Sequence, residues 1–320
     1  FVEEAFKKGA SIAIVDEILF DIEKASGTVI LVENTLNALL ELANYYRRKL
    51  NLKVVGITGS CGKTSTKDLV AGFLSAKYKV FKTKGNFNNQ IGLPLMILEL
   101  DSSHDIAVLE MGMSDLNEID LLAKTAMPDL AVITNIGLSH IENLKTQENI
   151  FKAKMEIVNY FNENNTLILN SEYNFLEKVN NKCFEIFKIG YNCEYDVFAS
   201  NIILEEDKTI FTANYKGESS EFIIPMAGKH NVLNSLLAIG VSLKLGLSFE
   251  EMKSGIKNIE ATSMRLQVIK KDNITIINDC YNASPDSMKS ALDVLSAYKE
   301  GRKIAILGNM NELGHKSFDS

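Results

Sequence analysis

The chain alternates short apolar runs with longer segments whose apolar residues recur every three or four positions. The short runs predict strands over residues 11–15, 29–32, 53–58, 105–110 and 129–134. The longer segments predict helices over residues 35–50, 63–76 and 116–126, the first of them capped by Thr35. This alternation is typical of an α/β fold with a central, mainly parallel sheet, in which ligands bind at the carboxyl ends of the strands. Glu110 and Asn135 both fall at such ends.

The predicted secondary structure changes twice in the second half of the chain. Residues 163–225 are richer in Asn, Tyr, Phe and Ile, and they predict a strand, a turn at Lys216–Gly217 and a second strand. A helix is predicted over residues 230–245. From residue 266 a further α/β unit begins, with predicted elements at 274–278 (strand), 286–298 (helix) and 303–307 (strand).

Composition narrows the class of protein. The chain has 320 residues, 46% of them hydrophobic and 23% charged, which indicates a folded protein of about two domains. Lys and Arg number 34 against 41 Asp and Glu, and a net charge of −7 argues against a general nucleic-acid binder. No apolar stretch reaches the ~20 residues of a membrane span, and the opening residues lack a signal-peptide pattern. The four cysteines lack a Cys-x-x-Cys spacing, so we expect a reducing cytoplasm.

The strongest chemical motif is Gly56-Ile-Thr-Gly-Ser-Cys-Gly-Lys-Thr-Ser65, where a strand enters a glycine turn and Lys-Thr begins a helix. Backbone N–H groups of such a turn, together with the helix N-terminus, bind anions. Lys63 then reaches the outer phosphates of a nucleotide, and the Thr64 hydroxyl suits Mg²⁺. Five residues, rather than the usual four, separate Gly56 from Gly62. The alternative is a chance Gly-Lys-Thr at a helix start.

Two further strand ends carry candidate chemistry. Glu110 ends an apolar strand, where a carboxylate needs water, a donor or a cation such as Mg²⁺. His140 follows the next strand in a glycine-containing loop, and it is either structural or catalytic. Lys152 and Lys154 lie two residues apart in a helical pattern, so they cannot share one face; one is solvated and the other points toward the site.

Three later residues are more ambiguous. Asn231 begins an apolar helix, where it either caps the helix or reads a base edge. Arg265 lies in a loop between two predicted units. Asp279 follows a predicted strand end and suits a ribose or a positioned lysine.

Taken in this order, the motifs resemble those of the Mur ligases, the ATP-dependent amide-forming enzymes of peptidoglycan synthesis. The matching strings cover residues 56–65, 88–95, 110–113, 134–144, 152–157, 228–231, 281–285 and 307–314. Asn-Asn-x-Ile-Gly-x-Pro-Leu, Glu-Met-Gly-Met and Leu-Gly-Asn-Met-x-Glu-Leu-Gly favour the branch that adds D-alanyl-D-alanine. The resemblance implies three parts: a remnant of a UDP-sugar-binding domain (1–33), a P-loop-type ATPase domain (34–265) and the beginning of a Rossmann-like C-terminal domain (266–320). The chain is therefore expected to be truncated at both ends.

The resemblance also implies a reaction and its residues. ATP would phosphorylate the terminal carboxylate of UDP-N-acetylmuramoyl-tripeptide, and the amine of D-alanyl-D-alanine would attack the acyl phosphate, in a cytoplasmic monomer. Catalytic roles fall to Lys63, Lys154, His140 and Arg265, and Mg²⁺ ligands would be Thr64, Glu110, His140 and Lys154, the last as a carbamate. Nucleotide contacts would come from Gly59, Ser60, Cys61, Gly62, Lys63, Thr64, Ser65, Asn231 and Asp279.

Three alternatives stay open at this point. The first is a related ligase, either another Mur enzyme or a folylpolyglutamate synthetase, which shares the ATP site. The second is a P-loop ATPase without ligase chemistry, although it has no need of His140 and Lys154. The third is a non-catalytic homologue.

Overall fold

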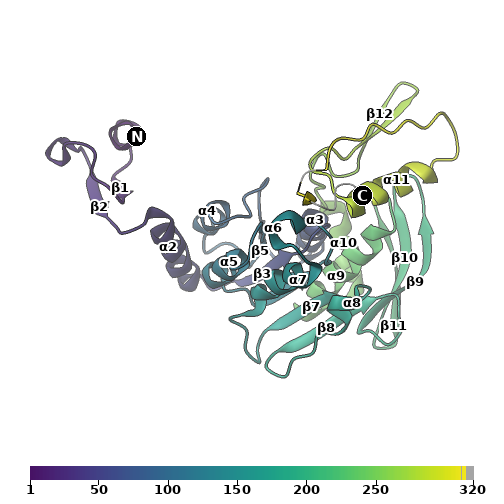
Figure 1. Ribbon diagram of the computed structural model, residues 1–320. Coiled ribbons are helices and arrows are strands. Elements are labelled where there is room, and N and C mark those ends of the chain that lie inside the picture. Colours follow the sequence, from purple (N-terminus) through teal and green to yellow (C-terminus); the bar gives the residue numbers. More distant parts are fainter. Residues whose placement is uncertain (311, 315–320) are drawn as a thin grey trace.

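A nine-stranded sheet forms the centre of the molecule in the computed structural model, which describes residues 1–310 and 312–314 (Figure 1). The strand order is β11-β10-β9-β8-β7-β6-β3-β5-β4. Pairing is parallel from β4 to β9 and antiparallel among β9, β10 and β11. The strands are β3 (Lys53–Thr58), β4 (Val80–Lys82), β5 (Ile106–Glu110), β6 (Leu130–Ile133), β7 (Thr166–Asn170), β8 (Glu185–Gly190), β9 (Val197–Leu204), β10 (Thr209–Tyr215) and β11 (Glu218–Ile224).

Helices cover both faces of this sheet. One face carries α2 (Thr35–Lys49), α4 (Gly92–Leu98), α5 (Glu118–Ala126), α6 (Ile141–Leu144), α7 (Gln147–Met155), the short η2 (Glu156–Val158) and α8 (Asn174–Glu177). The other carries α3 (Lys63–Leu74), α9 (His230–Lys244), α10 (Phe249–Gly255) and η3 (Ile256–Asn258). Successive residues of β3 enter opposite cores, Val54 one and Val55 the other, and both are fully buried. Burial on both faces is the reason why the central strands read as continuous apolar runs.

The two ends of the chain lie outside this sheet. The N-terminal part contains α1 (Val2–Lys7), η1 (Ile22–Lys24) and a parallel pair, β1 (Ile12–Val15) with β2 (Thr28–Leu31), and it stands apart in Figure 1. The C-terminal part contains an antiparallel ribbon of β12 (Gln267–Lys271) and β13 (Ile274–Asn278), followed by α11 (Pro285–Ala297). The proposed domain boundaries after residues 33 and 265 stay predictions.

The α/β architecture and most of the predicted elements are confirmed, and β3 and β13 match their predicted bounds. Two details were wrong. Asn34, not Thr35, caps α2, because its Oδ1 accepts from the Asn37 amide at 2.8 Å while Thr35 bonds Asp16. Residues 303–307 form no strand, and Ile304 and Ile306 are 63% and 94% exposed. Apolar composition favours a strand, but a strand also needs a neighbour to bond, and no described segment pairs with this one.

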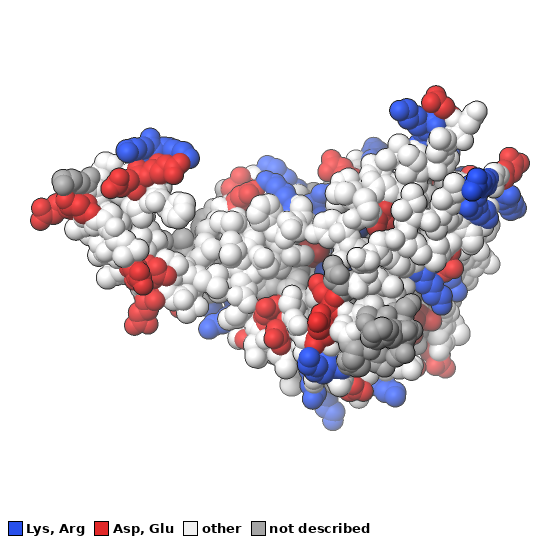
Figure 2. Space-filling model, turned by 45° about the horizontal axis from the view of Figure 1, so that its top comes forward, with Lys and Arg blue, Asp and Glu red and all other residues white. Residues whose placement is uncertain are grey.

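The surface charge and the length of the helices are relevant to whether nucleic acid or a membrane is a partner of this chain. On the face drawn in Figure 2, acidic and basic side chains are interspersed and do not gather into one broad basic patch. Within the described residues, no helix is long and apolar enough to cross a membrane.

Candidate active site

The glycine turn between β3 and α3 has the backbone geometry of an anion-binding loop. Gly59 has φ +148° and Gly62 has φ +81°, and both angles favour residues without a side chain. A Cβ on Gly59 would lie 1.8 Å from the Thr134 Oγ1, and one on Gly62 would lie 2.8 Å from the Asn234 Oδ1. Both glycines are therefore required by close approach as well as by conformation. Gly62 directly precedes α3, so the turn leads into a free helix N-terminus.

The segment after β6 holds this turn in place. Asn135, which is 7% exposed, accepts from the Cys61 amide through its side chain at 2.8 Å and from the Ser60 amide through its carbonyl at 3.2 Å. The Ser60 hydroxyl in turn accepts from the Gly137 amide at 2.9 Å. Thr134 Oγ1 donates to the Cys61 carbonyl. The turn is thus fixed before any ligand binds, which lowers the entropy that a ligand must overcome.

Lys63 is the first residue of α3, and its ammonium group folds back onto the turn. Its Nζ donates to the Gly59 carbonyl at 2.8 Å. The next residue, Thr64, is buried, whereas Ser65 is half-buried. The predicted loop residues 59–65 therefore lie together, with one cation at the mouth of the turn.

A buried carboxylate lies directly beside the turn. Glu110, at the end of β5, is 3% exposed and accepts from the Thr64 hydroxyl at 3.0 Å and from the Asn88 side-chain amide at 2.9 Å. The Glu110 backbone amide donates to the Thr83 hydroxyl at 2.9 Å. Because β5 and β3 are parallel neighbours, the ends of both strands reach the same edge of the sheet. Thr64 and Glu110, both predicted Mg²⁺ ligands, are therefore in contact, and their binding of a metal stays a prediction.

Lys154 and His140 bring further titratable groups to this edge. Lys154 is 1% exposed on α7, while Lys152 is exposed, so the two lysines divide as expected. Burial lowers the pKa of Lys154 well below its ordinary value, and the positive charge of Lys63 lowers it further. Burial also lowers the pKa of His140 to about 4, assisted by the charges of Lys154 and Lys63. These electrostatic couplings indicate that the three residues face one locality.

A carboxylate of the C-terminal part reaches His140. Glu312 Oε2 lies 2.8 Å from His140 Nδ1, and the Glu142 amide donates to the Glu312 carbonyl at 3.0 Å. Burial raises the pKa of Glu312, although Lys63 opposes that shift. With Nδ1 engaged in this way, Nε2 is the ring nitrogen left for a ligand.

Asn231 is buried near the start of α9, where its side chain is already engaged. Its Nδ2 donates to the Ala227 carbonyl at 2.8 Å, and its Oδ1 accepts from Asn234 at 3.1 Å. Asn234 also bonds Thr66 of α3, at 3.3 Å. The residue therefore lies next to the helix of the phosphate loop, and it stays a predicted adenine contact.

Arg265 and Asp279 lie together at the junction with the C-terminal part. The Arg265 guanidinium lies over the Tyr281 ring at 4.1 Å, and its Nε is buried without a hydrogen-bond partner in the described structure. Asp279 accepts from the Leu266 amide at 3.1 Å, and burial raises its pKa. No contact joins Arg265 to the turn among the described residues, so its predicted role at the phosphates stays a prediction.

Oxygen donors beside the turn suit a hard cation. The Thr64 hydroxyl and the Glu110 carboxylate are the ligand types that Mg²⁺ prefers. Among the described residues, no group of three or more His, Cys, Asp or Glu side chains gathers as a metal site. A second cation beside His140 would meet the ammonium groups of Lys63 and Lys154, so that position fits a cation only if Lys154 carries a negative charge.

Sequence reasoning missed several supporting residues. Thr83 and Asn88 hold Glu110, yet neither is next to it in sequence. Ser284, at the start of α11, lies 3.2 Å from the Cys61 sulfur through its hydroxyl. Asn88 and Ser284 fall within matched strings and were therefore detectable, whereas Thr83 depends on a contact that no spacing reveals.

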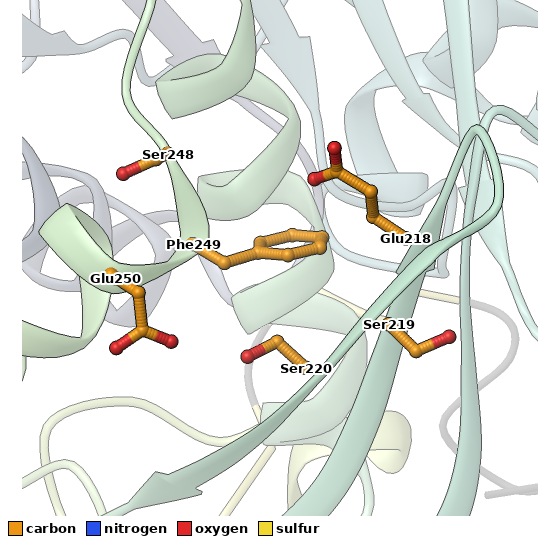
Figure 3. Close-up of a pocket in the computed structure, with 6 residues that line it drawn as sticks. All are labelled: Glu218, Ser219, Ser220, Ser248, Phe249 and Glu250. Atoms are coloured by element: carbon orange, nitrogen blue, oxygen red, sulfur yellow. The ribbon is translucent and has the colours of Figure 1, made fainter.

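A separate hollow of about 380 Å³ lies elsewhere on the surface (Figure 3). Its lining residues come from β11 and from the start of α10: Glu218, Ser219, Ser220, Ser248, Phe249 and Glu250. Figure 3 shows the Phe249 ring at its centre, with the two carboxylates on either side. Two like charges disfavour an anionic nucleotide, so this hollow is no rival to the glycine turn.

The Mur ligase middle domain matches residues 57–242, and the Mur ligase glutamate ligase domain matches residues 264–319. UDP-N-acetylmuramoyl-tripeptide–D-alanyl-D-alanine ligase from Bacillus subtilis is 42% identical over 98% of this chain and 68% of the relative. The Escherichia coli ligase of the same name is 32% identical over 99% of this chain and 70% of the relative.

Solved structures agree with these sequence matches. MurF from Acinetobacter baumannii superposes with a TM-score of 0.90 at 33% identity, covering 99% of this chain and 69% of that one. MurF ligase from Thermotoga maritima in complex with ADP gives 0.90 at 30% identity, covering 100% and 73%. Matches of this extent, in sequence and in fold, show that the chain belongs to the Mur ligase family.

Proposed function

We propose that this chain is an ATP-dependent peptide ligase that joins D-alanyl-D-alanine to UDP-N-acetylmuramoyl-tripeptide in peptidoglycan precursor synthesis. The observation that carries the proposal is the meeting of the glycine turn, the Thr64–Glu110 pair and the buried Lys154 at one edge of the sheet. The names of the relatives support the choice of substrates. ATP as phosphoryl donor is supported by the ADP complex of the Thermotoga relative.

The reaction brings two anions together, so charge neutralisation dominates the barrier. Lys63 would leave the Gly59 carbonyl and bind the outer phosphates, while the Gly62 amide and the amides at the start of α3 hold the remaining oxygens. The tripeptide carboxylate then takes the terminal phosphoryl group as an acyl phosphate, and ADP leaves. The dipeptide amine attacks the acyl carbon, and phosphate departs as the amide forms.

Thr64 and Glu110 would hold a Mg²⁺ ion beside the phosphates. When bound, the ion neutralises phosphate charge and orients the terminal phosphoryl group. Asn88 and Thr83 would fix the carboxylate that faces it, through the Asn88 side-chain amide and the Glu110 backbone amide.

Lys154 would act as a carbamate. Burial and the charge of Lys63 depress its pKa, so the folded protein favours the neutral amine, which is the nucleophile that adds CO₂ with loss of a proton. The resulting anion would accept the charge of Lys63 and, with His140 Nε2, offer ligands for a second Mg²⁺. Lys63 and the modified Lys154 would then form an ion pair.

The remaining predicted residues would act on the nucleotide and on closure. Asn231 would offer adenine the second N–H of its Nδ2 and the second lone pair of its Oδ1, which the bonds to Ala227 and Asn234 leave unused. Asp279 would approach the ribose, and Arg265 would leave the Tyr281 ring for the phosphates as the C-terminal part closes. Closure would exclude the water that hydrolyses acyl phosphates. Because ATP is an intracellular donor, we place the reaction in the cytoplasm; a monomeric state stays a prediction.

Phosphate release in four mixtures tests this function. The chain with ATP and Mg²⁺ is given neither substrate, each substrate alone, or both. We expect sustained release only with both substrates, and its loss in Lys63→Ala but not in Lys152→Ala, a lysine exposed to solvent. Release independent of both substrates would indicate an ATPase without ligase chemistry. Release with another amino acid in place of the dipeptide would indicate a different ligase.

A further inference from the structure

A buried charge cluster lies on α3, just beyond the phosphate loop. Lys67 and Asp68 are adjacent in sequence, and they are 2% and 1% exposed. Asp68 Oδ1 lies 3.1 Å from the ammonium nitrogens of both Lys67 and Lys82. Buried charges are costly unless they are paired and hydrogen-bonded, so these three side chains have to satisfy one another inside the protein.

The second oxygen of Asp68 holds a segment almost 200 residues away in sequence. Its Oδ2 accepts from the backbone amide of Thr262 at 2.9 Å and from the Thr262 hydroxyl at 2.8 Å. Lys82 adds a bond to the Glu260 carbonyl at 3.2 Å. Thr262 is therefore fastened to α3, the helix that begins with the phosphate-binding lysine, and Glu260 is fastened to β4.

The backbone changes character immediately after this anchor. Met264 and Leu266 have φ angles of +59° and +49°, which is the left-handed region that non-glycine residues seldom adopt. The Leu266 amide bonds Asp279, so this residue already belongs to the C-terminal part. Three residues, 263–265, thus separate the anchor from the part that follows, and two of the three, Ser263 and Met264, are exposed. A short strained connection of this kind is a place where a pivot forms.

The same cluster continues toward the active site. Lys67 Nζ donates to the Thr83 carbonyl at 3.0 Å, and the Thr83 hydroxyl accepts from the Glu110 amide. Glu110 accepts from Thr64 at the phosphate loop. A continuous series of bonds therefore runs from the Thr262 anchor to the carboxylate assigned to Mg²⁺.

We propose that Asp68 is a positioning residue: it anchors the interdomain segment at Thr262 and so fixes the pivot about which the C-terminal part closes over the phosphate loop. The proposal rests on the ligase function, which requires that closure. If the anchor is lost, the next attachment is the Glu260 carbonyl, which accepts from Lys82 of β4. The free connection would then lengthen from three residues to five. Effective concentration falls as about the −3/2 power of tether length, so closed complexes become roughly twofold rarer.

Thr262→Val and Thr262→Ser form a matched pair for the test. Valine removes the hydroxyl bond to Asp68, whereas serine keeps it. Asn258→Ala is the control, since it breaks a bond between the same two segments, to Ser75, outside the cluster. Asp68→Asn removes the charge of the anchoring residue itself. If this variant does not fold, the comparison of Thr262→Val with Thr262→Ser decides whether Asp68 anchors the segment. The measurements are native trypsin cleavage after Arg265, located by mass spectrometry, and kcat and KM for ATP.

We expect Thr262→Val to raise cleavage after Arg265 by about tenfold, the equivalent of one hydrogen bond to a charged group. Its kcat should fall up to about twofold with the KM for ATP unchanged, while Thr262→Ser and Asn258→Ala match the wild type. Equal cleavage in Val and Ser variants, or a rise at all sites together, would overturn the proposal. If the wild type releases no phosphate, the ligase function fails, yet the cleavage comparison still decides whether Asp68 anchors the segment.

Discussion

Replacing Lys154 with methionine distinguishes the effect of this lysine on the stability of the folded protein from its effect on the reaction. The side chain is 1% exposed, and no described residue forms an ion pair with it. Methionine has a similar length and no titratable group, so it fits the same space without the cost of removing a proton from the lysine on folding. We therefore expect Lys154→Met to be more stable than the unmodified wild type at pH 7 and to release no phosphate.

The magnitude follows from proton linkage. Burial lowers the pKa of Lys154 in the folded state, while the unfolded chain keeps an ordinary value of about 10.4. Between the two values the unfolded state binds one more proton, so the unfolding free energy of the wild type rises with pH. The slope is about 1.36 kcal/mol per pH unit, which gives up to about 2.7 kcal/mol from pH 7 to pH 9. The variant lacks this contribution, so its advantage shrinks across the same range.

Urea unfolding at pH 7, 8 and 9 in CO₂-depleted buffer measures the effect. Lys152→Met is the control, because this lysine lies on the same helix and is exposed. The control should follow the wild type, whereas the Lys154→Met curve should converge on it as pH rises. Adding bicarbonate should change the wild type and leave Lys154→Met unaltered. Parallel pH dependence in wild type and Lys154→Met would refute the reasoning.

Three other substitutions test the site. Gly59→Ala places a methyl group 1.8 Å from Thr134 Oγ1, so we expect the free energy of unfolding in urea to fall by about 2–4 kcal/mol and ADP binding, measured by calorimetry, to weaken. The control is Gly217→Ala, where φ is +86° but the added methyl group meets open space, so it should lose less stability and bind ADP normally. Glu110→Gln keeps the shape and removes the charge, and we expect turnover to fall at least about 100-fold without recovery at high Mg²⁺. His140 has a pKa of about 4 against an ordinary 6.5, so its stabilisation is lost as pH falls between them. His140→Gln should reduce acid destabilisation by up to about 2 kcal/mol after solvent screening, and an unchanged acid-unfolding curve would contradict this.

The sequence predicted the parts of the site that follow from local pattern. The strand before the turn, the helix after it and the carboxylate at Glu110 all depend on residues whose roles are set by nearby neighbours. Strand ends in a parallel sheet share one edge, so the meeting of Thr64 with Glu110 followed from topology.

Long-range contacts were beyond the reach of pattern. Thr83 holds Glu110 from β4's end, and Thr262 meets Asp68 across 194 positions, and neither pairing leaves a trace in spacing. Residues 303–307 show the opposite failure, since their apolar composition suggested a strand, yet none of the residues that the structure describes pairs with them. Local preference is readable from sequence, whereas a partner's position depends on the whole fold.

We propose that the glycine turn, Glu110, His140 and Lys154 serve one nucleotide and its metal ions. Crystals grown with a non-hydrolysable ATP analogue, Mn²⁺ and bicarbonate would show this arrangement through anomalous scattering from manganese. We predict a peak bound by Thr64 and Glu110 beside phosphates held on residues 59–63, and a second peak at His140 and a carbamate on Lys154. Manganese bound away from these side chains, or a nucleotide bound off the turn, would contradict the account.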